Sequence, residues 1–521
     1  MNGIELEILW SNLISIVSEQ ARALQRIAFS PVVREAGDLA NALFDRQGRM
    51  LAQAVTGTPG HINSLAAAGR HFVEAFPPNT LHPDDVLITN DPWLSAGHFF
   101  DITVMLPVFL DDRLIAFFGS TIHHTDIGGY GVGAGARDVH EEGLWIPLLK
   151  LYEAGQPNAV LHQIIRRNVR TPDHVFGDLA AQISSARMAR ERLTALLDRH
   201  GLRDLDTLAE AIITRSEIAT RESIRKLKAG TYHGESLFDV PGGDVVCLRT
   251  AVTIDAEQGT ILIDFAGSSG SSPYGINVVM NYTHAYSTFA IRSCLDPDLP
   301  NNFGSLAPIK VVAPPGCIVN CQYPSPVNAR HVVGMYVPMP ILKALSHVMP
   351  QRVLAEGAGA VWTMQIHGRH ADGLPFTSSM FNYSGGMGAR RTKPGPDATC
   401  YPTGVAAVPL EVMEASLPIL FARKELRAGS GGDGTMRGGE GQIIEFAMRT
   451  DQPWLLNAVT SRMVHAAEGL LGGKAGAPGR FLINGEPASS ARKLTMQPAD
   501  QVTIETPGGG GYGEPAPSCE A

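Results

Sequence analysis

One segment, residues 101–124, constrains the fold more than any other, because only a short polar turn separates two apolar runs in it. Such runs predict two consecutive β-strands that pair antiparallel. In that arrangement the loop before the first strand and the loop after the second lie at the same end of the pair. His98, Asp101 and His123 occupy these positions. We therefore expect their side chains to converge.

The side chains that are expected to converge suit a divalent cation. Imidazoles and carboxylates are ligands for zinc, manganese or iron(II), and the lack of nearby thiolates argues against a closed structural zinc site. Asp38, at the start of a predicted β-hairpin (37–53), can supply a further carboxylate. The alternative is that His98 and His124 are surface loop residues and that His123 is a hydrogen-bonded core histidine. The residues alone leave both interpretations open.

Hydrophobic periodicity predicts the other elements of the N-terminal half. Apolar residues at helical spacing indicate an amphipathic helix over residues 4–28. Two stretches with a helical period, within residues 173–228, predict an antiparallel helical hairpin. Further strands are expected within 86–93 and 144–151. This mixture indicates an α+β fold with a β-rich core around the candidate metal site.

The composition of the chain changes at Gly230. Beyond it, short β runs alternate with Gly, Pro and Ser turns, residues 331–371 contain apolar stretches suited to helix, and the remainder is rich in glycine. A chain of 521 residues exceeds what one hydrophobic core supports. We predict an N-terminal metal-binding region (1–230) and a β-rich C-terminal region (231–521). The glycine clusters are interpreted as tight turns that need a positive φ.

Composition disfavours several classes of protein. The formal net charge is −9, and no basic patch suited to nucleic acid is found. The absence of a long apolar run or a signal peptide, together with six dispersed cysteines, predicts a cytoplasmic protein with reduced thiols and no membrane span. The segment GGKAG has Ala475 after Lys474, so it is not a Walker-type phosphate loop, and no G-x-S-x-G nucleophile elbow occurs. We expect the chain to bind no nucleotide by itself.

Ordered motifs along nearly the whole chain resemble the hydantoinase B family. This family includes the B subunits of ATP-dependent hydantoinases and lactamases, the second half of 5-oxoprolinase and the α subunit of acetone carboxylase. So many motifs in order are specific for the family, although not for a substrate. They include GDLANALFDRQGRMLAQ (37–53), NDPW with GHFFDITV (90–104), HHTDIGG (123–129), EEGLWIP with Lys150 (141–150), RNVRTPDHVFGDL (167–179), PSPVNAR (324–330), RGGEGQ (437–442) and GGGGYGEP (508–515).

The resemblance implies one divalent metal, zinc, manganese or iron, held by Asp38, His98, Asp101 and His123. It favours His123 over His124 as the ligand. It also implies a hetero-oligomer with a separate hydantoinase A-type chain. That partner would bind ATP and Mg²⁺ and phosphorylate the oxygen of an amide.

The implied function is ATP-dependent hydrolysis of a cyclic amide, such as a hydantoin, 5-oxoproline or another lactam. Asp126 and Glu142 are candidates for a general base or for a hydrogen-bond acceptor that supports a metal ligand. The alternatives are that Asp126 caps the turn before Gly128 and that Glu142 is structural.

Other hypotheses stay open at this point. Arg170, Arg330 and Arg390 can meet a phosphate or a carboxylate, although ordinary salt bridges are more frequent. The sequence departs from the family pattern at 38–40, which reads Asp-Leu-Ala instead of Asp-Phe-Ser, and at 59–61, so the substrate is in doubt. The alternative activity is that of an ATP-dependent ketone carboxylase acting on acetone or acetophenone. A third hypothesis is a metal-stabilised assembly protein without turnover.

Overall fold

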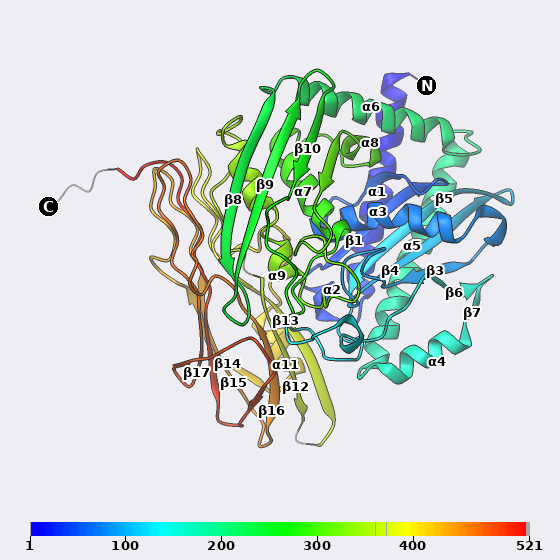
Figure 1. Cartoon of the computed structure of the whole chain (residues 1–521). Helices are drawn as coiled ribbons and strands as arrows, with labels where there is room; N and C mark the ends of the chain where they lie inside the picture. Colours follow the sequence, from blue (N-terminus) through cyan, green and yellow to red (C-terminus); the bar gives the residue numbers. More distant parts are fainter. Residues whose placement is uncertain (1, 360, 371, 517–521) are drawn as a thin grey trace.

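The computed structural model describes residues 2–359, 361–370 and 372–516 (Figure 1). Within them, the chain forms helices and four β-sheets, so the expected mixed α and β architecture is confirmed. No helix in these residues is both long and apolar enough to pass through a bilayer.

The first sheet contains the candidate site. Its seven strands have the order β2-β1-β5-β4-β3-β6-β7, and every neighbouring pair is antiparallel. The predicted hairpin at 37–53 and the strand pair at 101–124 are confirmed. The strands are β1 (Leu39–Asp45), β2 (Met50–Gln53), β3 (Val86–Thr89), β4 (Asp101–Leu110), β5 (Arg113–His123), β6 (Leu149–Glu153) and β7 (Gln156–Pro157).

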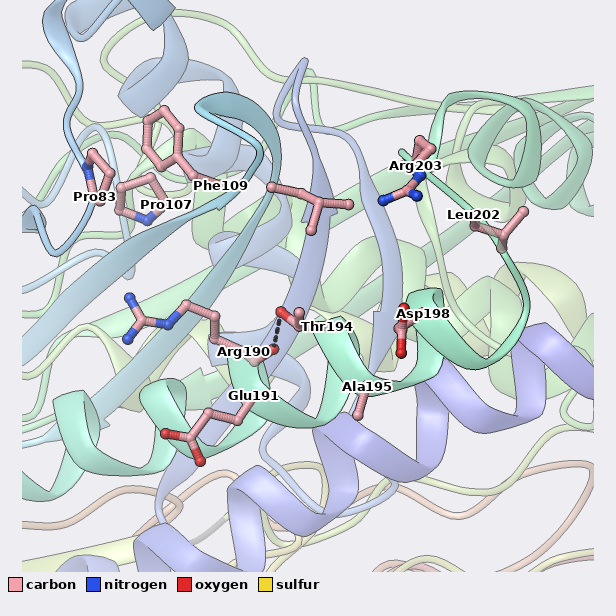
Figure 2. Close-up of a pocket in the computed structure, with 11 residues that line it drawn as sticks. Pro83, Pro107, Phe109, Arg190, Glu191, Thr194, Ala195, Asp198, Leu202 and Arg203 are labelled. Atoms are coloured by element: carbon pink, nitrogen blue, oxygen red, sulfur yellow. Dashed lines mark hydrogen bonds between the residues drawn. The ribbon is translucent and has the colours of Figure 1, made fainter.

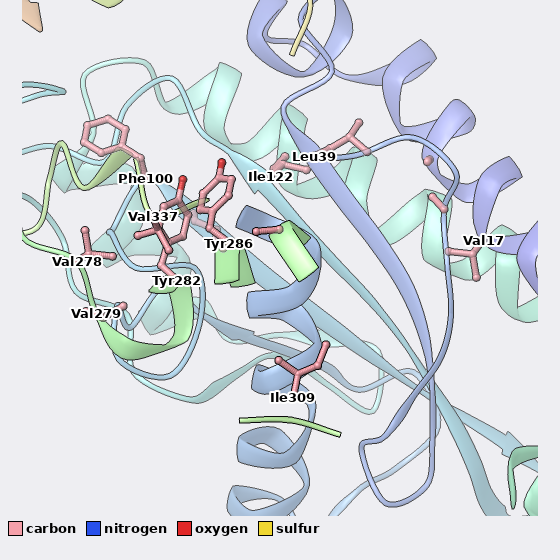
Figure 3. Close-up of a cluster of buried hydrophobic side chains, with 14 of the residues drawn as sticks. Val17, Leu39, Phe100, Ile122, Val278, Val279, Tyr282, Tyr286, Ile309 and Val337 are labelled. Carbon is pink, nitrogen blue, oxygen red and sulfur yellow. The ribbon is translucent and has the colours of Figure 1, made fainter. Parts of the chain in front are cut away.

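Strand β1 is buried along its whole length because helices cover both faces of the sheet. Successive side chains of a strand point to opposite faces. Leu39 belongs to the hydrophobic cluster of α1 (Gly3–Ile27), and Ala40 belongs to the cluster of α3 (Pro59–Ala75). Figure 3 shows part of the first cluster, with Leu39 beside its register partner Ile122. A strand with two covered faces is expected to be mainly apolar, and in β1 only Asn41 and Asp45 are polar.

Helices α5 (Pro172–Arg199) and α6 (Asp206–Arg225) form where the helical period predicts them. The prediction that they pack on each other as a hairpin is wrong, because α5 lies along α1 and α6 packs against the short helix α8 (Phe303–Leu306). Gly304 permits the second contact, since a Cβ there would lie 2.0 Å from the carbonyl oxygen of Ile213. Periodicity identifies an apolar face but not the element that covers it.

The second sheet begins at Gly230, where the sequence predicts a boundary. Its order is β11-β10-β9-β8, with β10 and β11 parallel and the other pairs antiparallel. One hydrophobic cluster contains residues from both sides of Gly230, such as Leu13 and Leu248, so the division there stays a prediction. The elements are β8 (Gly230–Asp239), β9 (Val245–Asp255), β10 (Thr260–Asp264), β11 (Ile309–Val312), α7 (Met280–Leu295), α9 (His331–Gly334) and α10 (Pro338–Leu345).

Two further sheets follow, with the orders β13-β12-β16-β19 and β14-β15-β20-β17-β18. The helical expectation for 331–371 is wrong in its last part, where β12 forms. The strands are β12 (Val361–Arg369), β13 (Pro375–Ser384), β14 (Ile419–Leu426), β15 (Gln442–Met448), β16 (Trp454–Val459), β17 (Arg480–Ile483), β18 (Glu486–Pro487), β19 (Leu494–Met496) and β20 (Gln501–Glu505). The remaining helices are α2 (Pro31–Arg34), α4 (Ala159–Asn168) and α11 (Leu410–Ser416).

Four glycine-rich segments lie side by side as extended chains, which we call the glycine bundle. Backbone hydrogen bonds join them, for example from Gly432 N to Gly509 O at 2.8 Å and from Gly439 N to Met387 O at 2.9 Å. The yellow, orange and red segments on the left of Figure 1 show the arrangement. The bundle consists of residues 385–396, 429–441, 467–477 and 507–513.

Most glycines of the bundle are required by close packing and not by a turn. A Cβ at Gly438 would lie 2.0 Å from Gly509 O, and a Cβ at Gly509 would lie 2.2 Å from Met387 O. Neither glycine has a positive φ. The interpretation of these clusters as positive-φ turns is therefore wrong for such positions, because glycine serves here to let two backbones touch.

A buried ion cluster joins the bundle to the second sheet. Glu356 Oε2 lies 2.7 Å from Arg462 Nη2, and Glu356 Oε1 lies 2.7 Å from both Lys343 Nζ and the Ser236 hydroxyl. Burial raises the pKa of Glu356, but Arg462 and Lys343 outweigh it, so the net pKa is lower than usual. The carboxylate is therefore ionised inside the protein.

Candidate metal centre

Strand pairing in the first sheet brings three of the predicted ligands together. Asp101 begins β4, His123 ends β5, and the two are register partners. His98 lies in the turn before β4, at the same end of the pair. One potential ligand atom from each residue lies within 4.8 Å of the others. The structure thus brings these three side chains together, as the strand topology predicts.

The Asp101 carboxylate is the centre of this cluster and is fully buried. Its Oδ1 lies 2.9 Å from His98 Nε2 and 3.1 Å from His123 Nδ1. Its Oδ2 lies 2.8 Å from His61 Nε2 and accepts a hydrogen bond from Arg330 Nη2. Burial alone raises the pKa of Asp101, but His61 and the charge of Arg330 hold it well below its usual range. Asp101 is therefore ionised at neutral pH.

The hydrogen bonding of His98 determines which ring nitrogen carries the proton. His98 Nδ1 lies 2.9 Å from the backbone oxygen of Asn328, which can only accept, so Nδ1 is the donor. Burial, followed by the charge of Arg330, lowers the pKa of His98 to about 4, so the ring is neutral at pH 7. His98 Nε2 and Asp101 Oδ1 are then two acceptors that face each other at 2.9 Å. A cation bound by both atoms would remove this repulsion.

Asp38 lies next to the cluster. Its backbone oxygen accepts a hydrogen bond from His123 N at 3.2 Å, and its Oδ1 lies 3.4 Å from His61 Nδ1. The group of three side chains within 4.8 Å does not include Asp38, so its role as a fourth ligand stays a prediction. Burial lowers the pKa of His61, but Asp101 and Asp38 outweigh this effect and raise it.

Two residues that contact Asp101 come from distant segments, and the strand argument misses them. His61 lies in the first turn of α3. In the sequence, only the departure from the family pattern at 59–61 draws attention to this residue. Arg330 ends the PSPVNAR motif, and its guanidinium also lies 3.9 Å from the ring centroid of Tyr282. The carboxylate that Arg330 meets is that of Asp101, so it forms a salt bridge within the protein.

A small cavity of about 40 Å³ lies against this cluster, and Asp38, His98 and His123 are among its lining residues. Tyr282 and His331 also line it, and Figure 3 shows Tyr282 next to Tyr286 in the hydrophobic surroundings. The volume holds an ion or a few water molecules. Burial, followed by the charge of Arg330, holds the pKa of His331 well below its usual range, so this ring is neutral.

The alternative that His98 and His124 are surface residues is wrong, because both are buried. His124 follows His123 but is not in the group of convergent side chains. Burial lowers the pKa of His124 to about 4.

Asp126 and Glu142 do not line the cavity. Asp126 Oδ1 accepts hydrogen bonds from Gly128 N at 3.0 Å and from Arg170 Nη1 at 2.8 Å, so the expected cap of the turn is found. Its Oδ2 accepts from the backbone of Arg170 and of Thr171. These contacts tie the turn after β5 to the start of α5.

Glu142 supports the segment that holds His98. Its Oε1 accepts hydrogen bonds from Val327 N at 2.6 Å and Asn328 N at 2.8 Å, and Asn328 O is the partner of His98 Nδ1. Burial raises the pKa of Glu142 well above its usual range. The side chain therefore acts on the cluster through the backbone of Asn328.

A larger cavity of about 530 Å³ lies between the end of β4 and α5, where Phe109, Arg190 and Asp198 are among its lining residues (Figure 2). It shares no lining residue with the small cavity. The candidate centre is defined by its chemistry and not by cavity size.

A buried carboxylate surrounded by imidazoles, at one end of an antiparallel strand pair, defines a candidate metalloprotein of mixed α and β fold. Comparison with known proteins gives the family. The family model for Hydantoinase B/oxoprolinase matches residues 2–515, and the chain belongs to this family. The resemblance found from the sequence motifs is confirmed.

Relatives match almost the entire chain. An uncharacterized protein of Methanocaldococcus jannaschii is 32% identical over 526 residues, which cover 99% of this chain and 91% of that protein. A putative D-/L-hydantoinase B subunit of Pseudomonas sp. is 30% identical, with coverage of 99% and 90%. The crystal structure of an ATP-dependent caprolactamase from Pseudomonas jessenii is similar at a TM-score of 0.90 and 26% identity, and covers 99% of this chain and 91% of that chain.

Proposed function

We propose that the chain is the metal-binding B subunit of an ATP-dependent enzyme that hydrolyses a cyclic amide, and that it acts with an ATP-binding A-type chain. Membership of the family supports this proposal. So do its relatives, which include a putative hydantoinase B subunit and an ATP-dependent caprolactamase. The lack of a nucleotide-binding motif in the sequence fits a division of labour between two chains.

The observation that carries the proposal is the pair of facing acceptors, His98 Nε2 and Asp101 Oδ1, at a buried cavity. Two imidazoles and one carboxylate fit a zinc, manganese or iron(II) ion. His98, Asp101 and His123 would hold the ion, with Asp38 as a further ligand. When bound, the ion would supply Lewis-acid chemistry at a carbonyl or phosphorylated carbonyl group.

Residues around the ligands would fix their orientation. Arg330 holds one oxygen of Asp101, which leaves the other oxygen toward the two imidazoles. Asn328 O keeps the proton of His98 on Nδ1. Glu142 positions Asn328, because its carboxylate accepts hydrogen bonds from the backbone N–H groups of Val327 and Asn328. Asp126 anchors the turn that follows His123. Their contacts favour positioning over proton transfer for both carboxyl groups.

Only the reacting carbonyl group of the substrate would enter the cavity, because a volume of about 40 Å³ does not hold a whole lactam ring beside an ion. An unstrained lactam is a poor electrophile, and transfer of a phosphoryl group from ATP to its oxygen, with Mg²⁺ on the partner chain, makes the carbon reactive. His331 is neutral, and its Nε2 has no hydrogen-bond partner in the described part of the chain. We assign His331 to accept the proton of the attacking water at Nε2 and then to pass that proton to the leaving nitrogen, which returns the ring to its neutral form.

The test combines metal analysis with turnover by the complex of this chain and an A-type partner. Wild-type protein should contain one transition-metal ion per chain and open hydantoin, 5-oxoproline or caprolactam only with ATP. His98→Ala should lose both the ion and the activity. His284→Ala is the matched control, because His284 lies outside the small cavity.

Three results would change the conclusion. Wild-type protein without a stoichiometric metal would remove the metal site. Incorporation of labelled bicarbonate into acetone or acetophenone, without ring opening, would replace the hydrolase by a carboxylase. A large loss of melting temperature in His98→Ala, with no ATP-dependent reaction in the wild type, would indicate a structural ion.

A further inference from the structure

A second polar cavity, of about 390 Å³, lies between the start of α5 and the sheet that contains β12. Its lining residues come from segments far apart in the sequence. Arg170 and Thr171 precede α5, His367 lies on β12, and Lys493 precedes β19. It shares no lining residue with the cavity at the candidate metal centre.

The cavity has more positive than negative charge. Arg170 is paired with Asp126 at 2.8 Å, yet its side chain is 41% exposed. Lys493 is half-buried, and its Nζ donates a hydrogen bond to Tyr130 O at 2.9 Å and lies 4.6 Å from the Tyr130 ring centroid. Among the residues that the structure describes, no carboxylate oxygen lies within 4.0 Å of Lys493 Nζ. A half-buried ammonium without a carboxylate is unusual, because buried charges are normally paired.

The pKa values report the same excess of positive charge. Burial and the neighbouring Arg170 lower the pKa of Lys493. Burial, followed by the charges of Lys493 and Arg170, lowers the pKa of His367 to about 4. Asp126, the carboxylate that pairs with Arg170, also accepts hydrogen bonds from the backbone at the start of α5. The Asp126 carboxylate is thus already bound by Arg170 and by the backbone before α5, and it forms no ion pair with Lys493.

The remaining lining groups fit a small organic anion. The Thr171 hydroxyl is buried and has no hydrogen-bond partner in the described part of the chain, so it can donate to an oxygen. Phe376 and Leu455 supply an apolar wall. A concave site with a few polar groups and an apolar wall, of this volume, is typical of small-molecule binding.

We propose that this cavity binds the oxyanion group, a phosphate or a carboxylate, of a small molecule whose apolar part packs against Phe376 and Leu455. Lys493 supplies a point charge to the oxyanion, and Thr171 donates from its hydroxyl. Arg170 supplies the N–H groups that remain beside its hydrogen bonds to Asp126 and to the backbone oxygen of Gly129. The site is separate from the metal centre and does not depend on the proposed function.

The test is calorimetric titration of the full chain with inorganic phosphate, phenyl phosphate and benzoate at low salt. Phenyl phosphate should bind more tightly than inorganic phosphate, because only the former has an apolar part. Lys493→Gln should weaken the binding about tenfold or more, and Lys493→Arg should retain most of it. Lys474→Gln, which removes an exposed lysine of the glycine bundle, is the matched control.

The probes distinguish the two oxyanions. Tighter binding of phenyl phosphate than of benzoate identifies a phosphate site, and the reverse order identifies a carboxylate site. No binding of any probe at millimolar concentration, or equal binding by the wild type and Lys493→Gln, would overturn the proposal.

A measurement on the wild-type chain covers the case in which Lys493→Gln does not fold. Acetylation of Lys493 by acetic anhydride, followed by mass spectrometry, should slow several-fold when phenyl phosphate is present. Acetylation of Lys474 should not change. Equal rates at Lys493 with and without both phenyl phosphate and benzoate would contradict the inference.

Discussion

Replacing Arg462 with methionine should destabilise the protein by about 3–5 kcal/mol at pH 7. The Arg462 and Glu356 side chains are at most 1% exposed, and their charged atoms lie 2.7 Å apart. Removal of the guanidinium leaves Glu356 with Lys343, the Ser236 hydroxyl and the backbone N–H of Glu468 as partners. Breaking a buried pair is costly because the remaining charge stays in a site of low polarity and is incompletely compensated.

The cost of Arg462→Met should become smaller as the pH falls. In the wild type the pKa of Glu356 is lower than usual, so this group contributes stability above its unfolded-state pKa and loses it as the pH falls through its folded-state pKa. Without Arg462, burial shifts the pKa of Glu356 upward. The variant should therefore lose less stability on acidification than the wild type.

Urea unfolding at pH 7 and pH 4 measures both effects. Arg249→Met is the matched control, because Arg249 pairs with Glu235 on the surface, and an exposed pair contributes at most about 1 kcal/mol. The double variant Arg462→Met, Glu356→Gln should be more stable than Arg462→Met alone, since it removes the incompletely compensated buried carboxylate and leaves Lys343 paired with Glu468. A loss below about 1 kcal/mol for Arg462→Met at pH 7, or an equal loss at both pH values, would refute the reasoning.

Three further predictions concern other parts of the molecule. Burial raises the pKa of Glu142, so the wild type loses stability as the pH rises toward that pKa. The melting temperature of Glu142→Gln should therefore rise relative to that of the wild type between pH 5 and pH 8. A difference in melting temperature that does not change with pH would contradict this. His331→Ala should lower kcat about 100-fold without loss of metal, whereas a metal-free variant would make His331 a ligand. Gly509→Ala should lower the free energy of unfolding by about 1–3 kcal/mol or more in chemical denaturation, because its Cβ would lie 2.2 Å from Met387 O. Gly3→Ala is the control and should be neutral or stabilising, because its Cβ would have nothing within 4 Å. Equal effects of the two substitutions would contradict the close-packing argument.

The part of the site that depends on local strand pairing can be predicted from the sequence. His98, Asp101 and His123 converge because two strands with a short connection have only one simple way to pair. His61 and Arg330 come from a helix and a loop that lie far from this pair in the sequence. Their contacts with Asp101 depend on long-range packing, which periodicity and turn signals do not encode.

The wrong predictions about the fold have similar causes. Helical spacing correctly predicts α5 and α6, but the choice of a packing partner is made by the whole tertiary structure, so the hairpin is not found. Glycine occurs both where φ is positive and where two backbones touch. At Gly438 and Gly509 the second reason applies, and the residue type alone does not distinguish them.

The glycine bundle has a thermodynamic consequence for the C-terminal region. Its segments are joined by peptide groups and present few apolar side chains to one another. Exposure of polar surface lowers the heat capacity, whereas exposure of apolar surface raises it. The heat-capacity change on unfolding should therefore be smaller for this region than the roughly 12–15 cal/mol/K per residue of ordinary globular proteins. Its free energy of unfolding should then vary less steeply with temperature on either side of its maximum.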